Sequence, residues 1–414
     1  MMSPPNILVL LIDCLRADAL FGQGRGCQTP TLDRLVRSGV SCTQAVSSAS
    51  STTPCVASLL TGTYSFVHGI RSIFGLKLSP QVPSLVEVFK AHGYHTYAEV
   101  SGPLFPETRL DRGFDTYDFR DGPAYLSTDW GTDLRHRLQT AYHQPWFGFL
   151  HLWELHHHRH ILPRFRSRAY GRNRYERALS CLDDQLASVI DLLPPNTIVV
   201  VHGDHGEKLV KTDLGYRTYR LLRDVFGPSI AKREGHEMDV YEDLIRVPLV
   251  FSFLGPAAHP QLPAGQTVTQ PVRQIDVLPT LLELAGLTPP DDIHGRSLVP
   301  ALATDTPLGL EAYLEAFLRI HSDPRDRRVG WRTAEWKYIY APENPELPEE
   351  LYQLTADPGE RHNLIETQPE VGLRLRQQIE RLQNGPLAAN PGQQMSADER
   401  RALEKRMADL GYLS

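Results

Sequence analysis

The stretch TIVVVHGDH at residues 197–205 decides the fold, because an uninterrupted apolar run ends there in a carboxylate and an imidazole. Such a run is typical of a strand that is covered on both faces of a parallel sheet. Similar runs occur at residues 6–12, 95–100, 146–153 and 247–253. They alternate with helical patterns. The sequence therefore predicts an α/β fold, in which helices sandwich a mostly parallel sheet.

Candidate metal ligands follow the carboxyl ends of these strands, where sheets of this class carry their active sites. Asp13 follows the run at 6–12, and Asp204 and His205 end the stretch quoted above. A buried carboxylate is unfavourable unless it is paired or bound to a cation. A carboxylate beside an imidazole can share one hard or borderline ion. We therefore expect Asp13, Asp204 and His205 to bind a metal.

Two other interpretations of these residues remain open. Asp13 could cap a helix that begins near Leu15, and Asp204 could serve an ordinary turn together with Gly206. If a metal binds, mixed oxygen and nitrogen ligands suit Zn, Mn or Ca. The sequence predicts one or two divalent ions of this kind and does not choose among them.

Thr52 is the candidate nucleophile. Pro54 disfavours a helical Thr53 and suits the first turn of the helix that follows. A hydroxyl at this point faces a helix N-terminus, where the backbone amides and the helix dipole favour an anion. Thr52 could then bind the metal and attack the bound ester. The alternative is that Thr52 or Thr53 is simply a helix cap.

The pattern changes after Pro300, where short aromatic strands are expected to form a small antiparallel sheet. We predict a catalytic domain at 1–306, an antiparallel α+β subdomain at 307–384, and a linker with a terminal helix at 385–414. Ser396 and Glu399 have the spacing of a capping box, which predicts the start of that helix.

Composition excludes several classes of protein. The formal net charge is -6, and Lys and Arg are scattered over the chain, so we expect no nucleic-acid partner. The five cysteines form no CxxC pair, which argues against a disulfide framework and favours a reducing compartment. We also expect no membrane span and no signal peptide, and we place the protein in the cytoplasm. The sequence does not specify an oligomeric state.

Several motifs in a fixed order resemble the sulfatase branch of the alkaline phosphatase superfamily. The resemblance covers about Asn6 to Asn363 and rests on IDCLRAD (12–18), TPTLDRLVRSGV (29–40), TTPCVASLLTGTYSFVHGI (52–70), RLDRGFDTYD (109–118), FLHLWELHHH (149–158), VVVHGDHGE (199–207), GHEMDVYEDLIRVPLVF (235–251), DVLPTLLELAGL (276–287), HGRSLVPAL (294–302) and LYQLTADPGERHNL (351–364). It implies that Asp13, Asp204 and His205 are metal ligands and that Thr52 occupies the nucleophile position and also contacts the metal.

The nucleophile motif departs from the family pattern. Sulfatases that this chain resembles carry a Cys or Ser that is converted to formylglycine, inside a Cys-x-Pro-Ser-Arg signature. The same frame here reads Thr52, Thr53, Pro54, Cys55 and Val56. Threonine cannot become formylglycine, so a mechanism of that type is not expected. Cys14, where the family often has a second aspartate, is another departure.

Two histidines are further candidates for catalysis. In HLWELHHHRH (151–160), the resemblance places His156 at a position that contacts substrate or a second metal. A histidine-rich loop without function is the alternative. By the same resemblance, His236 could bind a second metal or protonate the leaving group, since imidazole titrates near neutral pH. Arg16 and Asp18 are expected to brace each other beside the first metal strand.

Three functions follow from these residues. The first is a metal-dependent hydrolase of small-molecule phosphate monoesters or diesters, because threonine nucleophiles in this superfamily belong to enzymes that act on phosphorus. The second keeps the fold and changes the reaction, to a sulfatase without formylglycine or a phosphotransferase. The third is a binding protein that has lost the chemistry. The loops from Gly122 to Gln144 and from Thr212 to Glu234 should determine specificity, and neither carries a recognisable motif.

Overall fold

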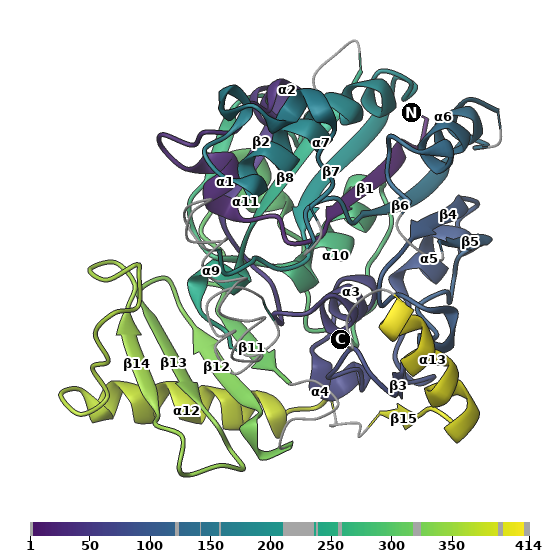
Figure 1. Ribbon diagram of the computed structural model, residues 1–414. Coiled ribbons are helices and arrows are strands. Elements are labelled where there is room, and N and C mark those ends of the chain that lie inside the picture. The colour runs from purple at the N-terminus through teal and green to yellow at the C-terminus, as the bar shows by residue number, and fades with distance from the viewer. Residues whose placement is uncertain are drawn as a thin grey trace.

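One large sheet forms the centre of the molecule (Figure 1). The computed structural model describes residues 3–120, 124–140, 142–156, 159–209, 236, 239–255, 259–317, 324–387 and 392–409. The sheet has nine strands in the order β10-β2-β8-β7-β1-β6-β4-β5, with β9 beside β2. These strands are β1 (Asn6–Ile12), β2 (Gly39–Val46), β4 (His95–Val100), β5 (Thr116–Phe119), β6 (Trp146–Leu152), β7 (Thr197–Gly203), β8 (Arg246–Leu254), β9 (Gln266–Val268) and β10 (Val272–Arg273).

The strand directions confirm the predicted mostly parallel sheet. Strands β7, β1, β6, β4 and β5 run parallel to one another. Strand β8 is antiparallel to both β7 and β2. All five strands expected from apolar runs form within a residue or two of the predicted bounds. The sequence therefore predicts the strands that precede Asp13 and Asp204 with nearly their true bounds.

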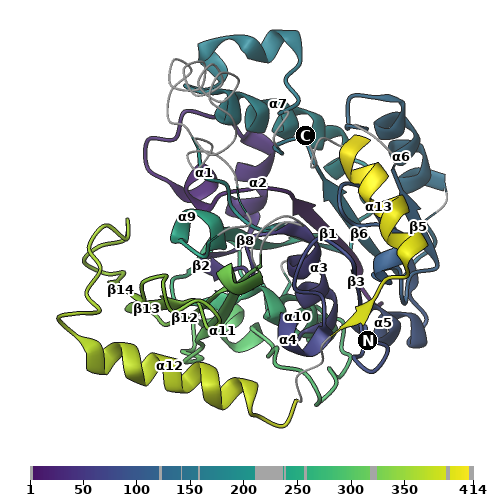
Figure 2. The ribbon, with the colours of Figure 1, turned by 60° about the horizontal axis from the view of Figure 1, so that its bottom comes forward.

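Helices cover both faces of the sheet (Figure 2). Alternate residues of β1 point to opposite sides: Leu8 and Leu10 belong to one apolar core, and Ile7 and Val9 belong to the other. The first core contains residues of α1 (Ala17–Phe21), α2 (Pro30–Ser38), α6 (Asp129–Thr140) and α7 (Arg174–Ile190). The second contains residues of α3 (Thr52–Thr61), α5 (Leu85–Ala91), α10 (Val277–Leu284) and α11 (Val299–Thr304).

The predicted aromatic strands form a four-stranded antiparallel sheet near the C-terminus. They are β11 (Ala312–Ala316), β12 (Arg328–Arg332), β13 (Trp336–Tyr340) and β14 (Glu350–Gln353). Helix α12 (Pro369–Gln383) lies along this sheet, with Leu375 and Ile379 in the same apolar core as Tyr313 and Tyr338 (Figure 1). That core also includes Tyr64 and Phe66, so the small sheet packs on the main part of the chain. The exact domain bounds stay a prediction.

The terminal helix α13 (Ala397–Asp409) begins where the capping-box spacing predicts. The Ser396 amide donates to Glu399 Oε2 at 2.8 Å, and the Glu399 amide donates to Ser396 Oγ at 3.2 Å. The shorter elements are α4 (Ser65–His68), α9 (Glu242–Ile245), η1 (Pro106–Thr108), η2 (Pro163–Arg166), η3 (Arg168–Tyr170), η5 (Gln274–Asp276), η6 (Pro324–Asp326) and the paired strands β3 (Leu76–Lys77) and β15 (Gln393–Gln394).

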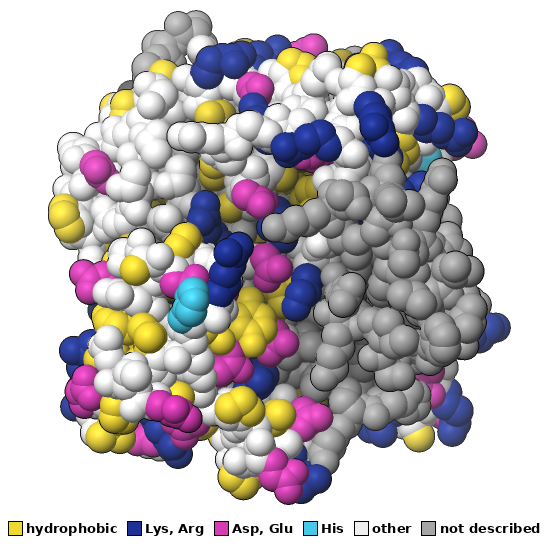
Figure 3. All heavy atoms as spheres, turned by 60° about the vertical axis from the view of Figure 1, so that its left-hand side comes forward, with side chains coloured by type: hydrophobic (Ala, Val, Ile, Leu, Met, Phe, Trp, Pro, Cys, Tyr) yellow, Lys and Arg dark blue, Asp and Glu magenta, His cyan; other side chains and the backbone are white. Residues whose placement is uncertain are grey.

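Surface and cysteines agree with the composition. On the face in Figure 3, Lys and Arg side chains lie interspersed with Asp and Glu side chains. All five cysteines are buried free thiols, as expected for a chain without a disulfide framework. In the described part of the chain, no helix combines the length and the apolar character needed to cross a bilayer.

Candidate active site

The site forms where β1, β6 and β7 end side by side. In the sheet register, Ile12 pairs with Leu152 of β6 and with Gly203 of β7. The residues that follow, Asp13 and Asp204, therefore enter the same space. Both side chains are fully buried. The structure thus brings together two of the carboxylates that the sequence singles out.

Cys14 forms the turn that directs these carboxylates. Its backbone is left-handed, with φ of 60°, a conformation that costs a non-glycine residue roughly 1–2 kcal/mol. The turn is held because the Cys14 amide donates to Asp204 Oδ1 at 3.1 Å, and because the Tyr175 hydroxyl donates to the Cys14 carbonyl at 2.8 Å. The Cys14 thiol donates to Asp13 Oδ1 at 2.8 Å. Asp13 therefore faces the site and does not act as the helix cap considered above.

Thr52 points at the same space from the start of α3. Its side chain is 1% exposed. Oγ1 of Thr52 lies 3.3 Å from His205 Nε2 and 3.5 Å from Asp13 Oδ2. The capping alternative is wrong, since the residue at the N-cap is Ser51 and the Thr53 hydroxyl donates to the Pro103 carbonyl at 3.0 Å. The hydroxyl of Thr52 is thus positioned among the candidate metal ligands.

Asp204 uses its two oxygens differently. Oδ1 accepts from the Cys14 amide and, at 2.7 Å, from the His205 amide, which is turn chemistry of the kind first considered as an alternative. Oδ2 has no hydrogen-bond donor among the described residues, and it lies 3.3 Å from His205 Nε2. A buried carboxylate oxygen without a donor is rare in folded proteins. This oxygen is therefore available to a cation.

The hydrogen bonds of His205 indicate which of its ring nitrogens could bind a cation. Its Nδ1 lies 2.8 Å from the Gly206 carbonyl, and a carbonyl can only accept, so Nδ1 carries the proton. Burial lowers the pKa of His205, which keeps the ring neutral. The lone pair on Nε2 then faces Asp204 Oδ2 and also Asp13 Oδ1, which is 3.8 Å away. Nε2 therefore offers a lone pair toward the two carboxylates and the Thr52 hydroxyl, as in histidines that bind metal through one nitrogen and donate to a backbone carbonyl through the other. The residues fit a divalent cation.

The charges around Asp13 and Asp204 also favour a bound cation. Burial, followed by the charge of Asp204, raises the pKa of Asp13 well above its usual value. Among the described residues, no Lys or Arg forms an ion pair with Asp13 or Asp204. A bound cation would reverse the shift in the Asp13 pKa, because it stabilises the charged form.

His236 lies beside His205 and forms a second group of candidate ligands. The two ring centroids are 4.3 Å apart, and Cys14, His205 and His236 each offer an atom that could hold a cation. His236 Nδ1 lies 3.0 Å from Glu207 Oε2. Burial opposes ionisation of Glu207, but the charge and hydrogen bond of His236, the charge of Arg159 and the Cys14 thiol together lower the pKa of Glu207 to about 2. The predicted residue His236 therefore lies beside His205, whose Nε2 is 3.3 Å from the Thr52 hydroxyl, and Glu207 fixes its ring.

His156 lies beside His236, at the edge of the site. Its side chain is buried and stacks on Trp153 at 4.6 Å between ring centroids. The His156 and His236 rings are 5.3 Å apart. Strand β6 ends at Leu152, so His156 lies in the following turn. His157 and His158 lie outside the described residues.

Two ligand candidates were not assigned a role from the sequence. His151, the penultimate residue of β6, places Nε2 3.7 Å from Asp13 Oδ2, and burial lowers its pKa to about 4. Its pairing with Leu11 puts it at the strand ends, a signal that strand alignment could have supplied. Glu207 was only noted as following His205. The expected brace is confirmed: Arg16 Nε donates to Asp18 Oδ1 and Nη2 donates to Oδ2, both at 2.8 Å.

Comparison with known proteins agrees with the motifs. Residues 5–287 match the family model described as Sulfatase, and residues 237–385 match the one described as N-sulphoglucosamine sulphohydrolase, C-terminal. An ulvan-active sulfatase of Formosa agariphila is 26% identical over 426 residues, which cover 88% of this chain and 77% of that protein. A Delta 4,5-hexuronate-2-O-sulfatase of Bacteroides thetaiotaomicron is 29% identical over 281 residues, which cover 66% of this chain.

The extent of these matches differs. The match to the hexuronate sulfatase spans 48% of that protein, so the chain corresponds to about half of its length. A solved structure of a phosphonate monoester hydrolase from Silicibacter pomeroyi superposes with a TM-score of 0.69 at 19% identity, covering 92% of this chain and 96% of that one. This likeness shows a shared fold. The resemblance inferred from the motifs is confirmed.

Proposed function

Because this chain belongs to the sulfatase family, we propose that it hydrolyses a sulfate ester through the hydroxyl of Thr52. The chain is a hydrolase of sulfuric or phosphoric esters. Phosphate was the first expectation from the sequence, and the relatives favour the sulfate alternative, since both curated relatives described above are named sulfatases. Sulfate is therefore the leading substrate class here, and phosphate is second.

A single observation carries the proposal. Thr52 Oγ1 lies within 3.5 Å of Asp13 Oδ2 and of His205 Nε2, at the first turn of α3. A helix N-terminus favours an anion, and the ligand set favours a cation. An ester oxyanion placed between them would lie against the Thr52 hydroxyl.

Asp13, Thr52, Asp204 and His205 would hold one divalent ion, which leaves the ring of His236 able to carry a proton. Zn, Mn or Ca suits these ligands. A bound ion would lower the pKa of the Thr52 hydroxyl and neutralise charge on the ester. The nucleophilic attack and the proton transfers are carried out by the side chains of Thr52 and His236.

In the first step, the Thr52 oxygen attacks sulfur after its proton has left to solvent, and the bond from sulfur to the alcohol oxygen breaks. The product is a sulfate ester of Thr52. His236 gives a proton to the departing alcohol oxygen, with its ring held by Glu207. Water then attacks sulfur and gives a proton to His236, and the bond from sulfur to the Thr52 oxygen breaks. Sulfate leaves and Thr52 is regenerated.

A phosphate or phosphonate ester is the second candidate. The observation in its favour is the threonine itself, which stands where the sulfatases that this chain resembles carry a convertible Cys or Ser. The phosphonate monoester hydrolase that shares the fold gives this candidate a structural precedent. A cytoplasmic location also stays a prediction, supported by the five buried free thiols.

Substitution of Thr52 tests the nucleophile. We expect Thr52→Ala to lower kcat/KM on an aryl sulfate by at least on the order of 10³, as for other catalytic nucleophiles, while the protein still binds metal. Thr53→Ala is the matched control, because that hydroxyl only bonds the Pro103 carbonyl. With a slow substrate, mass spectrometry should find SO₃ added to the Thr52 peptide. Turnover retained in Thr52→Ala would remove Thr52 as nucleophile.

A panel of substrates separates the candidate functions. The wild-type protein is assayed on aryl sulfate, aryl phosphate, phosphodiester and phosphonate esters after loading with Zn, Mn or Ca. Sulfate turnover should exceed the others. A reversed order would make the protein a phosphoester hydrolase. No turnover, together with no metal retained on elemental analysis, would support the binding protein considered above.

A further inference from the structure

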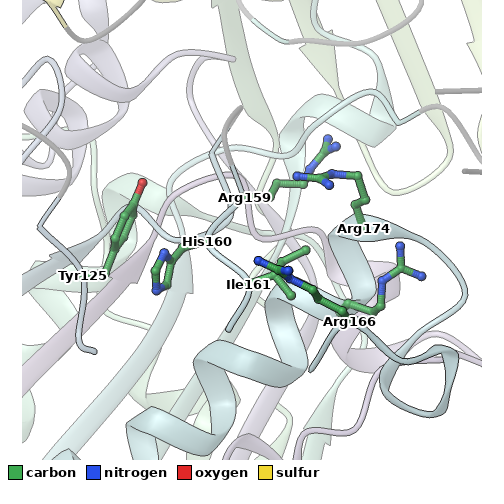
Figure 4. Close-up of a pocket in the computed structure, with 7 residues that line it drawn as sticks. Tyr125, Arg159, His160, Ile161, Arg166 and Arg174 are labelled. Atoms are coloured by element: carbon green, nitrogen blue, oxygen red, sulfur yellow. The ribbon is translucent and has the colours of Figure 1, made fainter. Parts of the chain in front are cut away.

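A basic pocket is lined in part by residues 159–161, which follow His156 closely in the sequence (Figure 4). Its volume is about 530 Å³, and we call it the arginine pocket because Arg159, Arg166, Arg174 and Arg177 line it. Tyr125 and His160 lie on one side of the pocket, and the labelled arginines lie on the other (Figure 4). No Asp or Glu is among the described residues that line it. A pocket lined by four arginines, with no acid among its described lining residues, suits an anion.

Arg159 connects this pocket to the catalytic residues. Its amide donates to the His156 carbonyl at 2.7 Å, and its side chain is 6% exposed. The guanidinium carbon lies 5.9 Å from the ring centroid of Tyr175, whose hydroxyl holds the Cys14 carbonyl. The backbone of Arg159 is left-handed, with φ of 41°. Such strain persists only where the surroundings hold it, and it gathers at functional sites.

Helix α7 adds to the positive field. Arg174 is its first residue and Arg177 lies in its first turn. A helix N-terminus carries partial positive charge, so arginine side chains are unfavourable there and an anion is favourable. The side chain of Asn173 caps this helix through the Glu176 amide at 2.9 Å. Both arginines line the pocket, and Arg177 also donates to the Gly171 carbonyl at 3.4 Å.

The opposite wall offers a flat surface. Tyr125 and His160 stack with ring centroids 4.1 Å apart and an angle of 17° between their planes. His160 Nε2 lies 2.7 Å from Ser127 Oγ, which fixes the ring. A ring-shaped alcohol could rest on this pair while an acidic substituent meets the arginines.

We propose that the arginine pocket binds a second anionic group, a carboxylate or a sulfate, carried by the alcohol part of the ester substrate. The inference rests on the proposed function, since it treats the pocket as a neighbour of the ester group at Thr52. Planar guanidinium groups bind such oxyanions through paired hydrogen bonds. The pocket then selects esters whose alcohol is itself an acid.

The test uses three matched esters: an aryl sulfate with a ring carboxylate, its methyl ester, and the ring sulfonate. The wild-type protein should prefer the charged esters over the methyl ester in kcat/KM. In Arg166→Gln and in Arg174→Gln, we expect this preference to fall about tenfold, because a hydrogen bond to a charged group is lost. Both residues are exposed, so these variants should fold. Arg164→Gln is the control: Arg164 lies in the same η2 turn and pairs with Asp184.

A binding measurement separates failure of the pocket from failure of the proposed function. The carboxylated phenol, which is the alcohol product, is titrated into the full-length protein without any turnover. Binding that weakens in Arg166→Gln and Arg174→Gln, and not in Arg164→Gln, supports the pocket even if no ester is cut. Equal affinity for the carboxylated phenol and its methyl ester, or variants that bind like the wild type, would overturn it. The sulfonate then tells whether sulfate or carboxylate is the better ligand.

Discussion

Buried carboxylates occur in two regions of this molecule, with different partners. At the candidate active site, Asp13 and Asp204 are fully buried, and no Lys or Arg of the described residues pairs with either. Beneath the small C-terminal sheet, Glu242 is paired with Arg332 at 3.0 Å and with Lys337 at 3.2 Å. The protein supplies its own cations in the second region, whereas the first region offers its carboxylates to the proposed metal ion. Buried carboxylates that lack basic partners are therefore the better guide to a metal site.

Removing one carboxylate from the first region should have the largest effect. We expect Asp204→Asn to lower kcat/KM by on the order of 10⁴, since charge stabilisation by a metal contributes several kcal/mol. The metal-free variant should unfold at a higher temperature than the metal-free wild type, because Asp13 and Asp204 no longer repel each other. Metal content, activity and melting temperature check this. A variant that keeps both metal and activity would contradict the ligand assignment.

The same kind of change in the second region should affect stability and not chemistry. Glu242→Gln leaves the charge of Arg332, which is almost fully buried, without its carboxylate partner, while the fully buried Lys337 keeps its ion pair with Glu360. Breaking a buried pair in this way costs about 3–5 kcal/mol. Denaturant unfolding should show that loss, while the folded variant retains turnover per metal-loaded molecule. Loss of metal in this variant would mean that the two regions are coupled.

Removing the metal should lower the stability of the protein only through the first region, the candidate active site. A ligand that binds only the folded state at a hundred times its Kd contributes about 2.7 kcal/mol to stability. We expect chelation to lower the melting temperature of the wild type and to leave that of Asp204→Asn where it was. Glu242→Gln should still respond to the metal. An equal response in wild type and Asp204→Asn would place the ion elsewhere.

The sequence predicted the strands whose ends place Asp13 and Asp204 in the first region. Fully buried parallel strands read as continuous apolar runs, so the strands before Asp13 and Asp204 were found with nearly their true bounds. Strand β2, whose sequence GVSCTQAV mixes small and polar residues, gave no such signal. The antiparallel direction of β8 could not be read from its composition either. Direction depends on the connections and the partners of a strand.

The rest of the site depends on contacts that no local pattern encodes. Glu207 contacts His236, which lies 29 residues later in the connection between β7 and β8. Arg159 approaches Tyr175, which follows it on α7 in the connection between β6 and β7. The left-handed turn at Cys14 was equally hidden, since a non-glycine residue gives no sign of such a conformation. Tyr125 lies in the segment from 122 to 144, which was expected to be a loop, but residues 129–140 of it form helix α6. The other expected specificity loop, at 212–234, lies outside the described residues, and the role of both segments in specificity stays a prediction.

Acid should weaken the second region gradually, and this is the smallest expected effect. Burial opposes the ionised form of Glu242, but Lys337 and Arg332 outweigh it and hold its pKa below the usual value. A carboxyl with a lowered folded-state pKa stabilises the protein above the unfolded-state value of 4.5 and loses that contribution as pH falls further. The loss from one group is about 1.4 kcal/mol per pH unit below that point.

Unfolding of the metal-free protein between pH 6 and about pH 3, compared with Glu242→Gln, measures this contribution. The variant should show a shallower fall. Parallel curves would mean that other carboxylates govern the acid response and that Glu242 is neutralised less strongly than its contacts indicate.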